Sequence, residues 1–296
     1  MSYKIAIASG KGGTGKTSVS VNLLQQFSHA LDVTLVDCDV EEPNDHLFLP
    51  QSKFLKSEEE FLQVAQINTN NCTYCRRCVE YCEFNAITVI PPLEFAKINA
   101  DLCHSCGACL VACEEDAIIE SPSHIGETRF NQVFALSKLI EGRLKIGSPM
   151  QTKLISKLKK KALAENKRIT LFDAPPGTSC PVVETIADTD YVIMVTEPTP
   201  FGLHDLKLGI HLIQEMNIPF GIIINKAGGP FKDTMEYIQS NHFELLAEIP
   251  FSKEYASIYS RGDLLTNAPQ EFLDIYRQIG NTLIEKMKIY EGNHRS

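Results

Sequence analysis

The chain has 296 residues, with 28 basic and 37 acidic side chains and a formal net charge of −9. Hydrophobic residues make up 44% and charged residues 22%, which are ordinary globular values and exclude a disordered or low-complexity chain. The length allows one large domain or two smaller ones, and a core of that size needs no disulfide bonds. The acidic balance argues against a nucleic-acid partner, because attraction to phosphate needs a basic surface.

Short apolar runs rich in β-branched residues predict buried strands, and patterns with helical spacing lie between most of them. The predicted strands are 4–9, 33–37, 168–173, 191–196, 220–225 and 244–249. The predicted helices are 18–29, 150–165, 204–216, 234–240 and 271–290. Strands that alternate with helices indicate an α/β fold with a doubly wound, mostly parallel sheet.

The alternation stops between about residues 61 and 121, where the sequence contains an internal repeat. Eight of the ten cysteines lie here, in two copies of C-x₂-C-x₂-C-x₃-C that begin at Cys72 and Cys103. Matching positions of the two copies are 31 residues apart throughout. We therefore expect a small duplicated domain at 63–121, inserted into a host domain formed by 1–62 and 122–296. The strands of 123–145 are not placed by the sequence.

The N-terminal segment shows no signal peptide, and the longest apolar runs are far too short to span a membrane. The tail at 285–296 has few large apolar residues, so membrane association is unsupported. We expect a cytoplasmic protein, and clustered thiols in a reducing compartment are typical of metal ligands or redox centres.

The segment Gly10–Thr17 reads GKGGTGKT, follows a predicted strand and opens a predicted helix. This pattern, G-x-x-x-x-G-K-[ST], is typical of a loop whose backbone amides wrap phosphates, with Lys16 at the terminal phosphates and the Thr17 hydroxyl on Mg²⁺. A chance glycine-rich turn is the alternative, and the strand–loop–helix context disfavours it. The expected nucleotide contacts are Gly10, Lys11, Gly12, Gly13, Thr14, Gly15, Lys16, Thr17 and Ser18.

Lys11 lies inside the loop, and at this point the sequence resembles the deviant Walker A class of P-loop ATPases, the MinD/Mrp type, whose loop reads K-G-G-x-G-K-[ST]. The resemblance implies that Lys11 crosses to the nucleotide of a second subunit, in an ATP-dependent homodimer or a heterodimer with a paralogue. The alternative is a solvated surface lysine.

The resemblance continues at the ends of two predicted strands. It implies that Asp39 orients the attacking water, and that Asp37 and Asp173 support Mg²⁺ directly or through water. It also implies that Gly177 presents its backbone amide to the γ-phosphate. Any one of these aspartates could instead be a helix cap or turn former, but three in the family's order favour a catalytic role.

Two further positions resemble the family's base site, with Asn225 hydrogen-bonding the adenine and Pro250 flanking its ring. The implied reaction is ATP hydrolysis without a covalent enzyme intermediate, in which Lys11, Lys16 and Mg²⁺ neutralise charge on the phosphoryl oxygens. We expect slow turnover that a partner stimulates.

The cysteine run is that of bacterial ferredoxins with [4Fe–4S] clusters, in which the fourth cysteine of each run ligates the other cluster. This resemblance assigns Cys72, Cys75, Cys78 and Cys113 to one cluster, and Cys103, Cys106, Cys109 and Cys82 to the second. Zinc is the alternative, although zinc sites usually pair two C-x₂-C units across a longer loop.

Glu83 and Glu114 follow the fourth cysteines, where ferredoxins usually have proline. Carboxylates there are expected to favour the oxidised clusters and lower their potential. Cys38, in a predicted strand end, is expected to pack as a small apolar residue. Cys180 ends the second of the two switch segments that the resemblance implies, 37–43 and 173–180, and has no assigned role. His104 and His124 also have none.

The whole chain thus resembles a MinD/Mrp-type ATPase with an inserted two-cluster ferredoxin-like domain. ATP or ADP, Mg²⁺ and two [4Fe–4S] clusters are the expected cofactors. The insert interrupts the chain between the two switch segments, so we expect nucleotide state to gate electron transfer to a redox partner protein. An Mrp-like iron–sulfur carrier ATPase and a MinD/ParA-like positioning ATPase are the alternatives.

Overall fold

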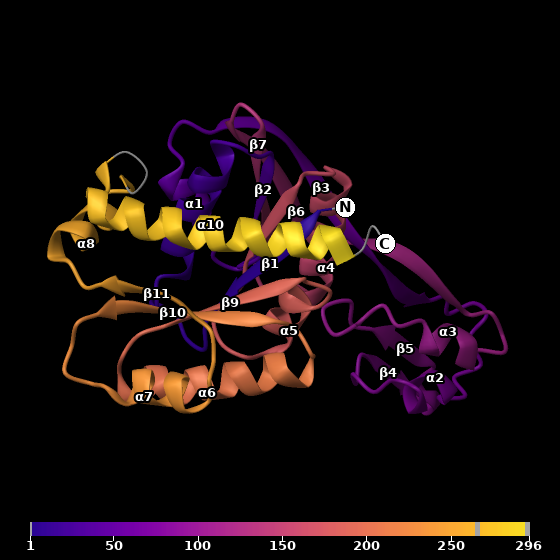
Figure 1. Ribbon diagram of the computed structural model, residues 1–296. Coiled ribbons are helices and arrows are strands. Elements are labelled where there is room, and N and C mark those ends of the chain that lie inside the picture. Colours follow the sequence, from indigo (N-terminus) through magenta and orange to yellow (C-terminus); the bar gives the residue numbers. More distant parts are fainter. Residues whose placement is uncertain (1, 264–266, 294–296) are drawn as a thin grey trace. The chain divides into compact units, whose positions relative to one another are not determined.

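The structure is a computed structural model that describes residues 2–263 and 267–293 (Figure 1). The chain forms two compact units. The sheet unit comprises Met1–Ser57, Arg129–Arg143 and Ile155–Ser296, and the cysteine unit comprises Glu58–Thr128 and Leu144–Leu154. The expected insert, 63–121, lies within the cysteine unit, and its exact boundaries stay a prediction. Residues 294–296 of the tail lie outside the described residues.

The main sheet has the strand order β11-β10-β9-β1-β8-β2-β7-β6-β3 within the described residues. Its strands are β1 (Tyr3–Ala8), β2 (Val33–Asp37), β3 (Lys53–Ile67), β6 (Ile118–Phe134), β7 (Ser137–Leu144), β8 (Ile169–Asp173), β9 (Tyr191–Thr196), β10 (Phe220–Ala227) and β11 (Leu245–Pro250). The strands from β11 to β7 pair in parallel. The predicted α/β class and mostly parallel sheet are therefore confirmed.

The six predicted strands correspond to β1, β2, β8, β9, β10 and β11, and most of their side chains are buried. The other described strands of this sheet, β3, β6 and β7, were not predicted, nor were β4 (Ile87–Ile90) and β5 (Phe95–Ile98) outside it. In β3 the first half is mostly exposed and ends in three consecutive glutamates, of which Glu60 is buried, so it lacks an apolar pattern. In β6 exposed and buried positions do not alternate regularly over its length. Both strands have residues in each of the two units.

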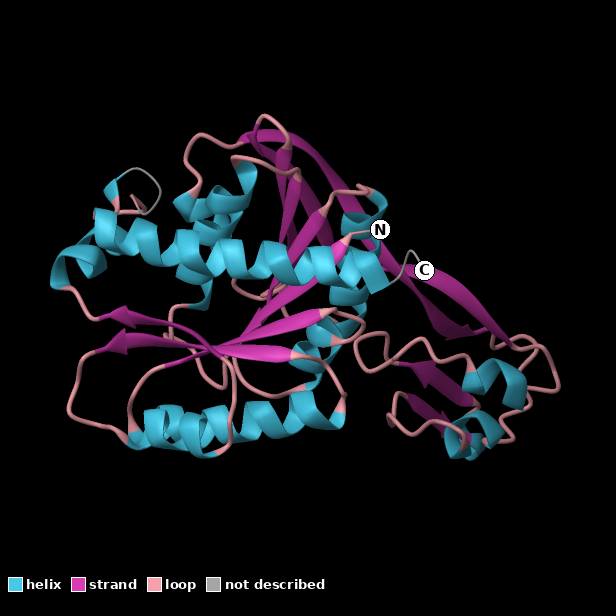
Figure 2. Ribbon diagram, viewed as in Figure 1, coloured by secondary structure: helices cyan, strands magenta, loops and turns pink. Residues whose placement is uncertain are grey.

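The predicted helices correspond to α1 (Lys16–Ser28), α4 (Gln151–Ala164), α6 (Pro200–Glu215), α7 (Asp233–Ser240) and α10 (Gln270–Asn293). The short helices α5 (Cys180–Ile186) and α8 (Lys253–Ser260), and the 3-10 turn η1 (Asp45–Phe48), were not predicted. Elements of about two turns give few positions in which to detect a helical period, although α7 is as short as α8 and was predicted. Figure 2 shows the helices of the sheet unit on both faces of its strands, as a doubly wound fold requires. No described helix is long and apolar enough to cross a membrane.

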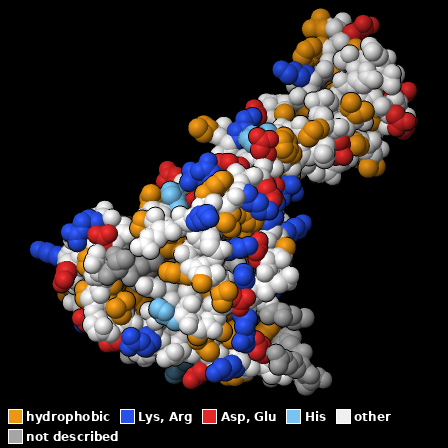
Figure 3. All heavy atoms as spheres, turned by 90° about the horizontal axis from the view of Figure 1, so that it is seen from above, with side chains coloured by type: hydrophobic (Ala, Val, Ile, Leu, Met, Phe, Trp, Pro, Cys, Tyr) orange, Lys and Arg blue, Asp and Glu red, His pale blue; other side chains and the backbone are white. Residues whose placement is uncertain are grey.

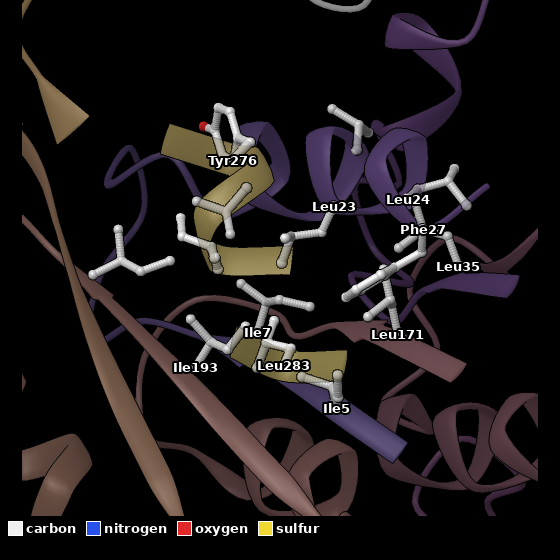
Figure 4. Packing of buried hydrophobic residues seen from close by; sticks show 14 of the residues in the cluster. Ile5, Ile7, Leu23, Leu24, Phe27, Leu35, Leu171, Ile193, Tyr276 and Leu283 are labelled. Atoms are coloured by element: carbon white, nitrogen blue, oxygen red, sulfur yellow. The ribbon is translucent and has the colours of Figure 1, made fainter. Parts of the chain in front are cut away.

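The core of the sheet unit lies between the central strands and the helix pair α1 and α10. Figure 4 shows Tyr276 and Leu283 of α10 packed among Leu23 of α1 and Ile5 and Ile7 of β1. All five side chains are essentially inaccessible to solvent. Each contributes about 1.5–3 kcal/mol through burial, so α10 fixes α1 on the sheet and with it the loop that precedes α1.

The cysteine unit contains two short helices, α2 (Arg77–Glu80) and α3 (Ala108–Ala112), the turn η2 (Pro91–Leu93), and an antiparallel pair, β4 (Ile87–Ile90) and β5 (Phe95–Ile98). Its backbone repeats as its sequence does. Residues with positive φ occur at matching positions of both copies: Tyr74 and Ser105, Arg76 and Gly107, Asn85 and Asp116. Residues with a side chain rarely adopt positive φ, so its recurrence at matching positions indicates that both copies form the same turns.

Candidate functional site

The loop between β1 and α1 is the centre of the candidate nucleotide site. Gly13 and Gly15 have φ of 77° and 96°, a conformation that favours glycine. A Cβ on Gly15 would lie 2.2 Å from the Asn225 Nδ2 atom, and one on Gly10 would lie 2.4 Å from the Cβ of Asp205. The packing of the protein itself therefore requires glycine at these two positions, whether or not a ligand is bound.

The loop is connected to β8 through the hydroxyl that was expected to bind Mg²⁺. Thr17 Oγ1 donates to Asp173 Oδ2 at 3.0 Å, and Ser20 Oγ donates to Asp173 Oδ1 at 2.9 Å. Lys16 is buried next to them. Since β1 and β8 are paired, with Ile7 opposite Asp173, the sheet register places these groups together. The structure thus brings Lys16, Thr17 and Asp173 to one site.

Asp37 lies directly opposite Asp173 on the neighbouring strand β2. It accepts backbone hydrogen bonds from Asp39 at 3.1 Å, from Asn44 at 2.8 Å and from Asp45 at 3.1 Å, so it organises the loop that follows β2. Burial, and then the charge of Asp173, raise the pKa of Asp37 well above its ordinary value. Burial also raises the pKa of Asp39 to about 6. A bound divalent cation would reverse these shifts, because it favours the ionised forms.

Asp45 belongs to this site, although it was not predicted as a site residue. Its side chain is fully buried, and neither carboxyl oxygen has a hydrogen-bond donor. Burial, and then the charges of Asp37 and Asp173, raise its pKa well above the ordinary value. Asn44 also reaches the site, where Thr17 Oγ1 lies 3.1 Å from its Oδ1. In the sequence, Asn44 and Asp45 look like ordinary turn residues.

Gly177 lies at the far side of the same loop, with a φ of 97°. Its backbone N–H donates to the carbonyl of Ser9 at 3.0 Å. The expected contact of this amide with a γ-phosphate would require that bond to open, and it stays a prediction.

Asn225 and Pro250, the two expected base contacts, line one hollow of about 270 Å³ beside Gly15. The Asn225 amide donates to the Thr14 carbonyl at 2.7 Å, and its oxygen accepts from the Lys226 N–H at 2.9 Å, so this side chain also fastens the phosphate loop. The aromatic lining of the hollow was not predicted and consists of Phe251, Tyr255 and Tyr259. These residues belong to or adjoin the undetected helix α8.

Lys11 forms an ion pair with Glu197, which follows β9. Lys226 binds the second oxygen of the same carboxylate at 3.1 Å and also donates to the Gly13 carbonyl at 2.7 Å. Burial by itself would raise the pKa of Glu197, but the hydrogen bonds from the two lysines outweigh it and lower the pKa. Glu197 is a second functional candidate that the sequence did not indicate.

The eight clustered cysteines line two separate hollows in the cysteine unit. The first is lined by Cys72, Cys75, Cys78 and Cys113. The second is lined by Cys82, Cys103, Cys106 and Cys109. Each hollow therefore has three cysteines of one copy and the fourth of the other copy.

The surroundings of the two hollows differ in charge and polarity. At the first, hydrogen bonds from Arg77 lower the pKa of the Cys75 thiol, and Arg77 forms an ion pair with Glu114. At the second, burial raises the pKa of the Cys109 thiol to about 11. The Ser105 hydroxyl lines the second hollow, buried and without a hydrogen-bond partner, so it is free to donate to sulfur. Among residues 2–263 and 267–293, no three His, Cys, Asp or Glu side chains gather as a site for one metal ion.

The two remaining cysteines lie in the sheet unit. Cys38 is fully buried and burial raises the pKa of its thiol well above the ordinary value, as expected of a packing residue. Cys180 is exposed at the start of α5.

A parallel sheet that places a glycine-rich loop, a buried lysine and strand-end aspartates at one edge defines a P-loop nucleotide-binding protein. Residues 5–265 match the model of the CobQ/CobB/MinD/ParA nucleotide binding domain. The chain belongs to this family.

Two uncharacterized proteins of Methanocaldococcus jannaschii are similar over nearly the whole chain. One is 32% identical over 88% of this chain and 90% of its own, and the other is 31% identical over 96% of both. An iron-sulfur cluster carrier protein of Pyrococcus horikoshii is 21% identical over 75% of this chain and 60% of its own.

Solved structures share the fold at low sequence identity. The cell division ATPase MinD of Pyrococcus furiosus superposes with a TM-score of 0.58 and 18% identity, over 96% of this chain and 99% of its own. The septum site-determining protein MinD of Pyrococcus horikoshii, complexed with Mg-ADP, gives 0.55 and 18%, over 96% of both chains.

Proposed function

We propose that this protein is a dimeric, ATP-hydrolysing switch that holds two [4Fe–4S] clusters and gates their electron transfer to a protein partner. The family supports the nucleotide half of this proposal. One observation supports the cluster half above all others: eight cysteines divide into two four-cysteine hollows. The division is the crossed one that two-cluster ferredoxins use.

In the nucleotide site, the loop amides and Lys16 would bind the phosphates, and Thr17 and Asp173 would hold the Mg²⁺ and its water shell. Asp39, partly buried and close to the charge of Lys16, would orient the attacking water. These groups act by position and charge, with no covalent intermediate. The hollow beside Asn225 and Pro250 has the size and aromatic lining that suit an adenine ring.

Each four-cysteine hollow would hold one cluster. A zinc ion would draw four thiolates to about 2.3 Å from one centre, whereas a four-iron cluster spreads them around a larger body. The eight cysteines divide four and four between the two hollows, and Ser105 offers a hydroxyl to the cluster sulfurs. Two such clusters would supply one-electron carriers, and the protein's part is to hold them, tune their potential and present them to a partner.

A redox partner would meet a mixed surface on the cysteine unit. Leu93, Val111 and Ile146 are exposed apolar side chains there, and the whole chain is acidic. Figure 3 shows hydrophobic, acidic and basic side chains interspersed over the visible face. Such a surface suits a protein partner with basic groups around an apolar centre.

The chain also contains a continuous element through which nucleotide state could reach the clusters. Strand β6 begins at Ile118, which lines the first hollow, and ends at Phe134 in the sheet unit. Within the sheet unit, Asn131 of β6 donates to Glu141 of β7 at 2.8 Å, and Glu141 lies opposite Asp37. A shift of the loop that follows Asp37 on nucleotide exchange would therefore displace β7 and β6.

The second candidate function is an iron–sulfur carrier ATPase, which the similarity to the Pyrococcus carrier protein favours. A MinD-like positioning role is third and has the fold similarity in its favour. Cluster transfer to an apo-protein would distinguish the carrier from a protein with resident clusters.

The number and ligation of the clusters can be tested directly. The anaerobically reconstituted protein should contain two [4Fe–4S] clusters by iron, sulfide and electron paramagnetic resonance analysis. Cys113→Ala should remove the cluster ligated by Cys72, and Cys82→Ala should remove the other one. Stoichiometric zinc in place of iron, or loss of both clusters in Cys38→Ala, would contradict the proposal.

A further inference from the structure

Glu197 is rigidly fixed beside the phosphate loop. The Thr199 N–H donates to the Glu197 carbonyl at 2.8 Å, and the Thr199 hydroxyl caps α6 by accepting from the Gly202 N–H at 3.0 Å. A Cβ on Gly202 would lie 2.2 Å from the Glu197 carbonyl oxygen. The turn is therefore closely packed, and the Glu197 side chain projects from a backbone that has little freedom.

The carboxylate of this residue is shared by two lysines. Each of its oxygens binds one ammonium group, from Lys11 of the loop and from Lys226 after β10. The Glu197 side chain is 14% exposed and that of Lys11 is 32% exposed, so water screens this pair less than a pair at the surface. Glu197 is thus the counter-ion of both lysines.

A bound nucleotide would compete for the same lysines. Lys11 belongs to the phosphate loop, and Lys226 is hydrogen-bonded to Gly13 of that loop. A triphosphate brings several negative charges to the loop, which attract the lysines and repel the Glu197 carboxylate. The ammonium of Lys11 cannot remain on Glu197 and at the same time reach a nucleotide in another subunit.

We propose that Glu197 is a positioning residue that holds Lys11 within its own subunit, and that ATP-dependent dimerisation requires Lys11 to leave it. This inference rests on the proposed role of Lys11 across the dimer interface. Glu197 then sets the protein concentration at which the ATP-bound dimer forms. It does not act on the bond that breaks.

The test is the monomer–dimer equilibrium of Glu197→Gln with a non-hydrolysable ATP analogue, measured by sedimentation over a range of protein concentrations. Freed of its counter-ion, Lys11 should strengthen the dimer about tenfold, which corresponds to about 1.4 kcal/mol. The ATPase rate per dimer should be unchanged, while half-maximal activity should occur at a lower protein concentration. Glu197→Asp should retain wild-type behaviour.

Glu215→Gln is the matched control, because Glu215 lies at the exposed end of α6, away from the loop. If Lys11→Ala still abolishes dimerisation, an unchanged or weaker dimer of a folded Glu197→Gln protein would overturn the role of Glu197. The proposed role of Lys11 would then be unaffected. Normal dimerisation of Lys11→Ala would instead refute the proposed role of Lys11, and with it the reason for holding that side chain.

Discussion

Replacing Asp45 with asparagine should stabilise the nucleotide-free protein, an unusual outcome for a buried residue at a functional site. Asp45 is 0% exposed, and both of its oxygens lack a donor. Its neighbours include the carboxylates of Asp37 and Asp173. Asparagine has the same shape, bears no charge and offers an N–H₂ group to these acceptors. Removing an unpaired buried charge is worth about 1–3 kcal/mol, or a rise in Tm of roughly 2–10 °C.

The gain should depend on pH. Burial raises the folded-state pKa of Asp45 above the unfolded value of about 3.9. The folded protein therefore binds more protons than the unfolded chain between these two values, and the wild type loses stability as pH rises through the folded-state pKa. Asp45→Asn does not lose stability in this way, so its advantage over the wild type should be absent near pH 4 and should grow as the pH rises.

Denaturant unfolding at several pH values, without nucleotide or Mg²⁺, measures both expectations. Asp188→Asn is the control, because Asp188 is exposed in the same unit and should show neither effect. A destabilised Asp45→Asn protein near pH 8, or a gain of equal size at both ends of the pH range, would refute the electrostatic reasoning.

Three further predictions concern the loop, the core and the clusters. Gly15→Ala should abolish nucleotide binding in calorimetry, since the new Cβ would lie 2.2 Å from a neighbouring amide nitrogen, and wild-type affinity would contradict the packing. Leu283→Ala should lower the free energy of unfolding by about 2–5 kcal/mol, as a denaturant midpoint would show; a loss below about 1 kcal/mol would mean that this helix is not part of the core. Glu83→Gln should raise the cluster potential in voltammetry more than Glu114→Gln, because only Glu114 is paired with an arginine. Equal potentials in both variants and the wild type would defeat the carboxylate hypothesis.

The parts of the fold that could be predicted are those with a short-range signal. Strands such as β1 and β8 are buried on both faces, so their sequences are continuous apolar runs. Strand β3 could not be found in this way, because its mostly exposed first half contains glutamates and no buried apolar run. Burial on one face over only part of a strand does not produce a regular sequence period.

The same distinction applies to the candidate site. The phosphate loop is a local motif, and the repeat in the cysteines is visible without any structure. Asp45 and Glu197 are different, because the role of each depends on contacts with residues that are distant in sequence. Asp45 is next to Asp173 only because β2 and β8 are neighbours, and Glu197 meets Lys11 only because β9 pairs with β1. Buried charge and shared counter-ions of this kind are properties of the folded chain.

We propose that nucleotide state controls the clusters, and the midpoint potentials of the clusters measure that control. Potentials of the reconstituted protein should be measured with ATP analogue, with ADP and without nucleotide, in the wild type and in Lys16→Ala. We predict a potential that differs between the ATP-bound and ADP-bound wild type and is constant in the Lys16 variant. Identical potentials in all three states of a wild type that hydrolyses ATP would contradict the account.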